Sequence, residues 1–373
     1  PIARQLLELF SSSYRIGLVH RECVVPWLVG MAAPARQKRC ENHGGHSMKA
    51  YRIEEHGECG RGRVVEMSEN DLDSGDVTIK TLFAGINYKD ALAGLGGAPI
   101  VRRYPCNGGI EAVGTVEASR DPRFTPGTSV IVHGRGIGVS HDGGLAERVR
   151  VPGDWVMQLP EGLGPREAAT LGVAGYSAAL AIDRLEALGI ASQGVPVVVS
   201  GATGGVGAFA VTMFAQLGYR VIAISSKPES SAFLTHLGAT EVIRPSEMGD
   251  RPLGPAQWCG GIDAAGGPIL AKILAGTDRN GAVASIGNAA GIELKTTVLP
   301  FILRGVTLTG INADSDMSTR NRVWDRLARD LKPAGLSAWA DVVPLDAVPE
   351  VMAKMLEGQT TGRSIVGFEG NNE

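Results

Sequence analysis

The sequence predicts an α/β protein that joins a β-rich, barrel-like domain to a doubly wound parallel sheet. Two patterns support this fold class. Residues 48–166 alternate short strand-like runs with Gly and Pro, as in "DVTIKTLFAG", "GIEAVGTVEAS" and "TSVIVHG", a pattern typical of a compact β domain. Residues 167–311 alternate apolar strands with helices, which indicates a parallel sheet covered on both faces.

The expected elements follow in chain order. The run "GPREAATLGVAGYSAALAIDRLEALGI" predicts a helix that begins at Pro165 and ends near Gly189. Strands are then expected at "VPVVVSG", "YRVIAIS", "EVIRP", "GIDAAGG", "GAVASIG" and "GVTLTGI", with helices at "VGAFAVTMFAQLG" and "PESSAFLTHLG". Because residues 312–368 end in the strand-like "GRSIVGF", we assign them, with residues 48–166, to the β-rich domain.

Composition excludes several classes of protein. The chain has 373 residues and a net charge of −3, so nothing favours nucleic acid or an anionic membrane as a partner. No apolar run reaches the roughly 18 residues of a membrane span. The five cysteines are scattered without a CxxC pair, which favours a reducing, cytoplasmic location. We expect Cys106 to be a buried thiol rather than a nucleophile.

Residues 1–47 differ from the rest of the chain. They carry several Arg, few acids and no strong strand pattern, whereas "MKAYRIEEHG" from Met48 resembles a first strand. A transit peptide fits this composition only in part, and translation from too far upstream is the alternative. We assign the segment no function.

The stretch "VVVSGATGGVGAFAV" predicts a dinucleotide site. Gly201, Gly204 and Gly207 form a GxxGxxG pattern, with Gly205 as an extra glycine, between a buried strand and a helix. Glycines there permit a tight turn and let the backbone approach a pyrophosphate at the N-terminus of the helix. A glycine triplet alone would indicate only a turn, but between a strand and a helix it predicts a Rossmann dinucleotide-binding domain.

The end of the next strand favours NADPH over NADH. An NAD site usually carries Asp or Glu there for the ribose 2′-hydroxyl, but this strand ends in Ser225, Ser226 and Lys227. Two hydroxyls and an ammonium suit a 2′-phosphate. The alternative is a helix cap followed by a solvated lysine. Arg244 is a second candidate cation, or an ordinary surface arginine.

No metal site is expected. Zinc needs a tight cluster of thiolate or imidazole ligands, and Ile110 stands in "NGGIEAVG" where a histidine ligand would be placed. The loop "AGINYKDAL" offers no cysteine. We expect His133 and His141 to be surface or hydrogen-bonded histidines.

Several motifs together resemble one family. "INYKDALA", "GGIEAVGTV", "DPRFTPG", "GGLAERVRV", "SGATGGVGAFAV" and "LPFILRGVTLTGI" are similar to the zinc-independent medium-chain dehydrogenases/reductases, in the quinone-oxidoreductase-like branch that contains acrylyl-CoA reductase. The resemblance covers Met48 to Phe368. It implies a GroES-like catalytic domain, a Rossmann domain, and NADPH-dependent reduction of the C=C bond of acryloyl-CoA to propionyl-CoA.

The resemblance also implies roles for individual residues. Tyr88 would lie beside the nicotinamide and the substrate, with Asn87 next to it, and residues 203–206, which include Thr203 and Val206, would hold the pyrophosphate. The remaining cofactor contacts would come from Ser225, Ser226, Lys227, Ile286, Gly287, Asn312, Gly362 and Arg363. One departure is Lys227, where we expect an arginine; the charge is kept but the bidentate fork is lost.

The chemistry needs an oxyanion donor, a proton donor and cations for a CoA substrate. The Asn87 amide or backbone N–H groups are candidates to stabilise an enolate, and Tyr88 is the candidate proton donor. A phenol of pKa near 10 is a mediocre acid, so water as donor and a packing role for Tyr88 are the alternatives. Arg102 and Arg103 are candidates for the CoA phosphates, or merely a solvated turn.

Two other functions stay open: an NADPH-dependent quinone or enone oxidoreductase, and a non-catalytic NADPH-binding module. The apolar strand "GVTLTGI" is expected to extend the sheet across a homodimer, by analogy with the family.

Overall fold

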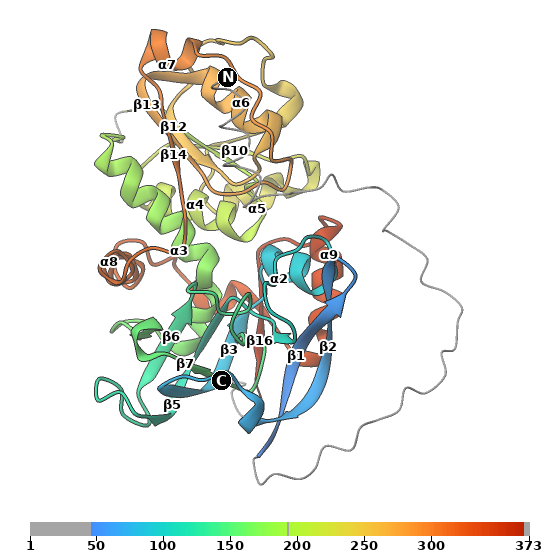
Figure 1. Cartoon of the computed structure of the whole chain (residues 1–373). Helices are drawn as coiled ribbons and strands as arrows, with labels where there is room; N and C mark the ends of the chain where they lie inside the picture. The colour runs from blue at the N-terminus through green and yellow to red at the C-terminus, as the bar shows by residue number, and fades with distance from the viewer. Residues whose placement is uncertain (1–45, 192–193, 369–373) are drawn as a thin grey trace, which may run out of the picture. The chain divides into compact units, whose positions relative to one another are not determined.

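The computed structural model describes residues 46–191 and 194–368, so the segment expected over residues 1–47 lies almost wholly outside the described residues (Figure 1). The strands are β1 (Ser47–His56), β2 (Cys59–Ser68), β3 (Val77–Gly85), β4 (Cys106–Asn107), β5 (Glu111–Ser119), β6 (Ser129–His133), β7 (Arg148–Val151), β8 (Val156–Gln158), β9 (Val197–Ser200), β10 (Val221–Ile224), β11 (Glu241–Ile243), β12 (Trp258–Asp263), β13 (Thr277–Ser285), β14 (Thr307–Gly310), β15 (Ala340–Val343) and β16 (Arg363–Gly367). The helices are α2 (Tyr88–Gly94), α3 (Pro165–Ala187), α4 (Gly205–Gln216), α5 (Ser231–His236), α6 (Gly267–Gly276), α7 (Leu299–Arg304), α8 (Met317–Leu327) and α9 (Val348–Leu356).

The β-rich part of the fold is confirmed. One sheet has the order β15-β16-β3-β5-β6-β8, with β7 also paired to β3, and a second has the order β2-β1-β4. Strand β16 pairs antiparallel with β3, so that Ile365 lies opposite Gly85. The end of the chain therefore returns to the first sheet. The domain boundaries at 166/167 and 311/312 remain a proposal, because α3 packs against strands of both large sheets.

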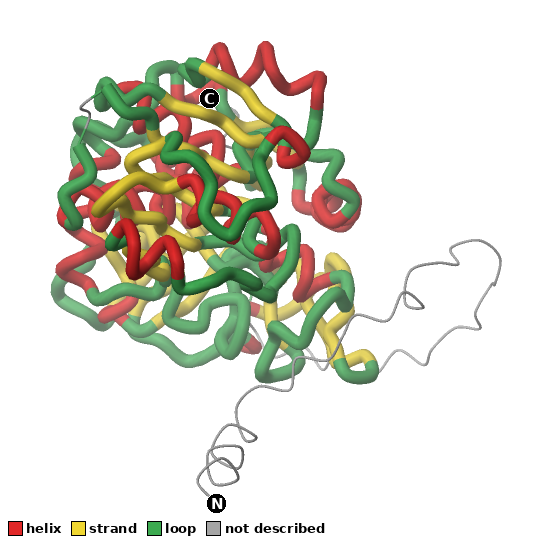
Figure 2. Tube along the Cα trace, turned by 90° about the horizontal axis from the view of Figure 1, so that it is seen from above, coloured by secondary structure: helices red, strands yellow, loops and turns green. Residues whose placement is uncertain are grey.

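The six-stranded sheet confirms the Rossmann prediction. Its order is β11-β10-β9-β12-β13-β14, and all of its strand pairs are parallel. The strands run outward in both directions from β9 and β12, and right-handed crossovers then place α4 and α5 on one face and α6 and α7 on the other (Figure 1). In Figure 2 the yellow strands lie among red helices. Such a reversal of strand order creates a crevice at the carboxyl ends of the strands, where ligands bind.

Helix α3 begins at Pro165, as predicted, but contains an unexpected break. Gly172 has φ +48° and ψ −153° inside the helix. A Cβ at Gly172 would lie 2.4 Å from Oε2 of Glu111, so only glycine fits there. The break leaves the backbone N–H of Val173 free to donate to the same carboxylate.

The segment "AGINYKDAL" was expected to be a loop, and the structure shows that most of it is helix α2. Asn87 is the N-cap residue, and its backbone N–H donates to Oδ2 of Asp90 over 2.9 Å. An Asn at the N-cap followed by an acid three residues later is a helix start signal. Within residues 46–191 and 194–368, no helix has the length and apolar character to cross a bilayer.

Candidate functional site

The glycine loop between β9 and α4 has the geometry of a phosphate cradle. Gly201 has φ +59°, which turns the chain from the strand toward the helix. A Cβ at Gly207 would lie 2.3 Å from the carbonyl oxygen of Gly201, so the helix packs on the loop only with glycine at this position. A Cβ at Gly204 would meet a single atom, the same oxygen, at 3.3 Å. The Gly204 side of the loop is therefore open.

The N-terminus of α4 supplies donors for an anion. Among the described residues, the backbone N–H groups of Gly205, Val206 and Gly207 have no acceptor, and this end of the helix carries the positive pole of its dipole. The carbonyl oxygen of Thr203 accepts from Gly362 N–H over 3.0 Å, which brings the segment before β16 against the loop. These features fit the pyrophosphate of a dinucleotide.

The end of β10 presents one free serine and one lysine. Ser225 is buried, and its Oγ lies 2.9 Å from Ser230 Oγ and accepts from Lys227 N–H over 3.1 Å. Its hydroxyl therefore serves the local turn. Ser226 is exposed. Lys227 Nζ donates to the Thr360 carbonyl over 2.9 Å, which leaves two of its N–H groups for another acceptor.

Arg244, the second candidate cation for the 2′-phosphate, forms no contact with Ser225, Ser226 or Lys227 among the interactions of the described residues. Its side chain is exposed and lies 3.2 Å from Glu247 Oε2, and its backbone N–H donates to the same carboxylate. The arrangement is that of a surface ion pair at the start of a short helical turn.

The other expected cofactor residues lie just beyond the carboxyl ends of β13 and β14. The backbone N–H groups of Ile286 and Gly287 donate to the Asp263 carbonyl over 2.8 and 3.4 Å. A Cβ at Gly287 would lie 2.1 Å from the Ala264 carbonyl oxygen, so glycine lets the two loops approach. Asn312 is exposed, and its Oδ1 accepts from Asp314 N–H.

Asp263 was missed from the sequence. Its carboxylate is fully buried at the end of β12, where Oδ1 accepts from Ser200 Oγ over 2.5 Å and Oδ2 from Gly266 N–H over 2.9 Å. Burial raises the pKa of Asp263, and the bonds from Ser200 and the backbone lower it. The carboxylate ties the end of β9 to the turn before α6, both of which border the crevice.

A buried network of Arg363, Glu111 and Asn87 lies where β16, β5 and α2 meet. Arg363 Nη2 donates to Glu111 Oε1 over 2.9 Å, and Arg363 Nη1 donates to Asn87 Oδ1 over 2.9 Å. The side chains of Arg363 and Glu111 are 4% and 1% exposed. Asn87 Nδ2 donates to Glu111 Oε1 over 3.0 Å and to the Gly85 carbonyl over 3.4 Å. Both ends of the Asn87 amide are therefore occupied within the protein.

The network changes the part expected of Arg363. Its remaining N–H groups donate to the carbonyls of Thr170, Ala169 and Ile86 at 3.0, 3.3 and 3.3 Å. A guanidinium has five N–H groups, and here all five are taken by protein acceptors. No donor is left for a cofactor phosphate, although a Cβ at Gly205 would lie 3.0 Å from Arg363 Cδ. Arg363 supports the glycine loop by packing.

Asp90 anchors the start of α2 to β5. Its Oδ1 accepts from Ile110 N–H over 3.0 Å and its Oδ2 from Asn87 N–H. Burial raises the pKa of Asp90 to about 7, the hydrogen bonds lower it, and the charge of Glu111 raises it further. Neither Glu111 nor Asp90 was singled out in the sequence.

Tyr88 differs from its neighbours in pointing away from this network. It is the first residue of α2, it is 39% exposed, and among the described residues its hydroxyl has no hydrogen bond. Of Asn87, Tyr88 and Asp90, Tyr88 is therefore the one whose polar group is available to a ligand.

Arg102 and Arg103, the candidates for the CoA phosphates, make different contacts. Arg103 forms an ion pair with Asp73, and its Nε donates to the Ser140 carbonyl over 3.2 Å. Arg102 is exposed, and its backbone N–H donates to Val139. Arg103 is thus committed to a surface ion pair, and Arg102 remains accessible to solvent.

The two histidines considered as metal ligands and the cysteine considered as a nucleophile lie in surroundings that do not suit those roles. His133 is fully buried and accepts from Trp324 Nε1 over 3.0 Å, and His141 bonds the Ser74 carbonyl; both histidines are hydrogen-bonded, as expected. Cys106 is buried, and burial raises the pKa of its thiol to about 12, which is unfavourable for a nucleophile. In the described part of the chain, no group of three or more His, Cys, Asp or Glu is arranged to hold a metal ion.

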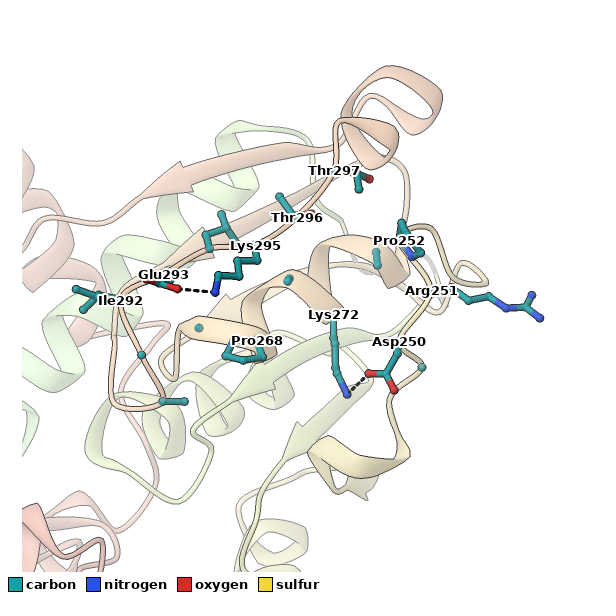
Figure 3. A pocket seen from close by; sticks show the side chains of 17 residues that line it. Asp250, Arg251, Pro252, Pro268, Lys272, Ile292, Glu293, Lys295, Thr296 and Thr297 are labelled. Atoms are coloured by element: carbon teal, nitrogen blue, oxygen red, sulfur yellow. Dashed lines mark ion pairs between the residues drawn. The ribbon is translucent and has the colours of Figure 1, made fainter. Parts of the chain in front are cut away.

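A cavity of about 900 Å³ lies on the outer side of α6, between residues 249–252 and 290–297. Its two lysines are paired with acids, Lys272 with Asp250 at 2.7 Å and Lys295 with Glu293 at 2.9 Å, and Arg251 points away from them (Figure 3). None of the residues expected at the cofactor site lines it. The crevice above the glycine loop remains the candidate site.

Comparisons with known proteins agree with the fold. The family described as alcohol dehydrogenase GroES-like domain matches residues 73–161, and the family described as zinc-binding dehydrogenase matches residues 205–329. The chain is 42% identical to acrylyl-CoA reductase AcuI of Ruegeria pomeroyi, over 81% of this chain and 93% of that protein.

Two solved relatives contain a nicotinamide cofactor. The chain is 44% identical, over 81% of its length and 93% of that protein, to YhfP of Bacillus subtilis, which is provisionally named a quinone oxidoreductase. The crystal structure of YhfP with NAD bound matches with a TM-score of 0.84 over 87% of this chain and 100% of that chain. The yhdH oxidoreductase from Salmonella enterica in complex with NADP matches with a TM-score of 0.83 and 41% identity, over 86% of this chain and 100% of that chain.

Proposed function

Because the chain belongs to the medium-chain dehydrogenase/reductase superfamily, in its quinone-oxidoreductase-like branch, we propose that it reduces the C=C bond of acryloyl-CoA to propionyl-CoA with NADPH. It is a nicotinamide-dependent oxidoreductase; the substrate and the choice of NADPH are the proposal. The observation that carries the proposal is the 42% identity to an acrylyl-CoA reductase over 81% of the chain.

The residues of the crevice suit NADPH. The open side of the loop at Gly204 and the N-terminus of α4 would take the pyrophosphate, while Ser226 and Lys227 would take the 2′-phosphate. Lys227 keeps two N–H groups for this purpose, and no carboxylate lies in residues 225–227 to repel the phosphate. When bound, NADPH would supply the hydride for the reduction.

The chain's own residues would handle the charge and the proton. Addition of hydride to the β-carbon of the thioester places negative charge on the thioester oxygen, and the α-carbon then takes a proton. We propose Tyr88 as the proton donor, because its hydroxyl is exposed and free of other hydrogen bonds. Asn87 would position Tyr88 rather than stabilise the enolate, because both ends of its amide are occupied. Backbone N–H groups are then the candidates for the enolate oxygen.

The test measures the loss of NADPH absorbance with acryloyl-CoA, with a simple quinone, and with NADH in place of NADPH. Turnover with acryloyl-CoA and NADPH, and little with NADH, is expected. Turnover with the quinone alone would replace the substrate assignment by that of a quinone reductase. NADPH binding without turnover of either acceptor would indicate a non-catalytic module.

A substitution tests the proton donor. Tyr88→Phe should lower kcat by about 100-fold or more, the usual contribution of a positioned general acid. Tyr104→Phe is the matched control, because the Tyr104 hydroxyl also has no hydrogen bond among the described residues but lies in the loop before β4. A Tyr88→Phe enzyme within about threefold of the parent would assign the proton to water.

We also propose a cytoplasmic homodimer. Cys106 and Cys259 are free thiols, in keeping with a reducing compartment. Strand β14 is an edge of the six-stranded sheet, and α7 beside it exposes Ile302 and Leu303, which are 68% and 57% accessible. Light scattering of the parent and of Ile302→Glu tests the dimer, which the added charge should weaken.

A further inference from the structure

The loop after β6 holds an arginine in a strained conformation. Gly134, Arg135 and Gly136 have φ of +68°, +55° and +92°, and Arg135 is one of two described non-glycine residues with positive φ. Such a conformation is unfavourable for a residue with a side chain, because its Cβ approaches the backbone closely. It is held in part by the backbone N–H of Arg135, which donates to Asp314 Oδ1 over 3.1 Å. Strained side chains of this kind cluster at functional sites.

Two buried donors at the end of β6 and in the loop after it have no acceptor in the described protein: Nδ1 of His133 and Nε of Arg135. His133 is fully buried, and its Nε2 accepts from Trp324 Nε1, so Nδ1 of the neutral ring carries the proton. Leaving a buried donor unpaired is unfavourable, because the group loses its hydrogen bonds to water. Both N–H groups are therefore available to a ligand that accepts hydrogen bonds.

The charges around these donors favour an anion. Asp314 Oδ1 accepts from Arg320 Nη2 over 2.8 Å and lies 3.9 Å from Arg135 Nε, so two guanidinium groups face one carboxylate. The side chain of Arg320 is fully buried. His133 adds no charge, because burial, Arg320 and Arg135 hold its pKa well below the usual range. Arg135, Arg320 and Asp314 together carry a net charge of about +1, from two guanidinium groups and one carboxylate.

The loop adjoins the candidate site. His133 lies directly opposite Glu111 in the β5–β6 pairing, and Glu111 bonds Asn87 next to Tyr88. The His133 ring is 4.7 Å from that of Tyr176, which stands one turn along α3 from Val173, another partner of Glu111. The loop is thus one layer of side chains away from the residues that hold Tyr88.

We propose that Arg135, with His133 beside it, binds an anionic oxygen group of the substrate, a carboxylate or a phosphate, and thereby determines substrate specificity. Guanidinium N–H groups suit such oxygens because their bonds are charge-assisted and can be bidentate. The side chain is 33% exposed, so part of it is accessible to a ligand. The proposal rests on the proposed function in one respect: the substrate is an electron-poor alkene reduced beside Tyr88.

The experiment compares Arg135→Gln and Arg135→Lys with the parent. Arg279→Gln is the matched control, because Arg279 is an exposed arginine on β13. The acceptors are acryloyl-CoA, its phosphate-free analogue acryloyl-pantetheine, the enone acid 4-oxo-2-pentenoate and the uncharged 3-penten-2-one. For each anionic acceptor, kcat/KM is divided by that of its uncharged counterpart.

Arg135→Gln should lower at least one of these kcat/KM ratios tenfold or more. Arg135→Lys should give a smaller fall in the same ratio, and Arg279→Gln should leave both ratios as in the parent. A fall confined to the CoA pair identifies a phosphate, and a fall confined to the enone pair identifies a carboxylate. Ratios that stay within about twofold of the parent, in an enzyme that turns over, would overturn the subsite and leave the proposed function standing.

A second measurement applies if the parent reduces none of the acceptors, which would refute the proposed function. Inorganic phosphate is titrated while tryptophan fluorescence is followed, because Trp324 bonds His133. A saturable change in the parent that Arg135→Gln abolishes would support the anion subsite. An identical response in the two proteins would overturn it.

Discussion

Replacing Arg363 by methionine separates two parts that this residue could play. The resemblance to the family implies a cofactor contact, whereas the structure gives all five guanidinium N–H groups to protein acceptors, with Nη2 on Glu111. In Arg363→Met the Glu111 carboxylate stays buried and keeps only its bonds from Asn87 and Val173. Removing one partner of a buried ion pair costs about 3–5 kcal/mol.

We therefore expect Arg363→Met to lower the free energy of unfolding by about 3–5 kcal/mol. Arg363→Lys keeps the charge but offers three N–H groups in place of five, so its loss should be smaller, about 1–3 kcal/mol. The control is Arg322→Met, which removes an ion pair of similar length, 2.8 Å to Asp183, from an arginine side chain that is 54% exposed. Exposed pairs contribute about 1 kcal/mol or less.

The assay is urea unfolding of the three variants without cofactor, together with titration of each by NADPH. Because Arg363 supports the site from within, kcat should fall in the Arg363 variants more than NADPH affinity does. An Arg363→Met protein as stable as the parent but more than 100-fold weaker in NADPH binding would refute the structural account and restore the cofactor contact.

Three further predictions follow from the loop, the lysine and the buried acid. Gly204→Ala places a Cβ on the open side of the loop and should weaken NADPH binding about tenfold with an unchanged urea midpoint, whereas Gly207→Ala, 2.3 Å from a backbone oxygen, should lose about 1–3 kcal/mol of stability. Lys227→Ala removes one charge-assisted contact and should raise KM for NADPH about tenfold or more while leaving KM for NADH unchanged; equal effects on both cofactors would refute the 2′-phosphate role. The pKa of Asp90 is raised from 3.8 to about 7 by folding, so the folded state binds this proton more tightly than the unfolded chain. Its stabilising contribution is complete below pH 4 and is lost as the pH rises to 7, and between pH 5 and 8 the parent should lose about 2–3 kcal/mol that an Asp90→Asn variant does not lose.

The parts of the molecule that were predicted correctly depend on neighbouring residues. The glycine pattern at 201–207 lies within one strand, one turn and one helix, so its spacing alone indicates the turn. Strand β9 was predicted from its continuous apolar run, which is typical of a sheet covered on both faces. The structure buries all three of its valines, Val197, Val198 and Val199. The start of α2 carried a local signal too, in Asn87 and Asp90, but it was taken for part of a loop.

The parts that were missed depend on contacts between distant segments. Arg363 and Glu111 are 252 residues apart, and they meet because β16 pairs with β3 and β3 pairs with β5. The glycine that makes room for them is Gly85, where a Cβ would lie 1.8 Å from Glu111 Oε1. Nothing near any of these residues in the sequence indicates the register of those pairings. The one available signal was the carboxylate of Glu111 at the start of an apolar strand, since a carboxylate must find a partner when buried.

The direction of each side chain in "NYKD" divides the chemistry of the site between neighbours. Successive residues of a helix point about 100° apart, so Asn87 and Asp90 turn into the protein while Tyr88, between them, turns out. Asn87 then affects catalysis only through the position of Tyr88. Its removal should cost kcat in the parent but little more in an enzyme that already carries Tyr88→Phe, because the two residues act as one unit. Had Asn87 been an enolate donor in its own right, the two losses would multiply. The non-additivity of Asn87→Ala and Tyr88→Phe therefore measures whether the inward network serves the reaction through this one hydroxyl.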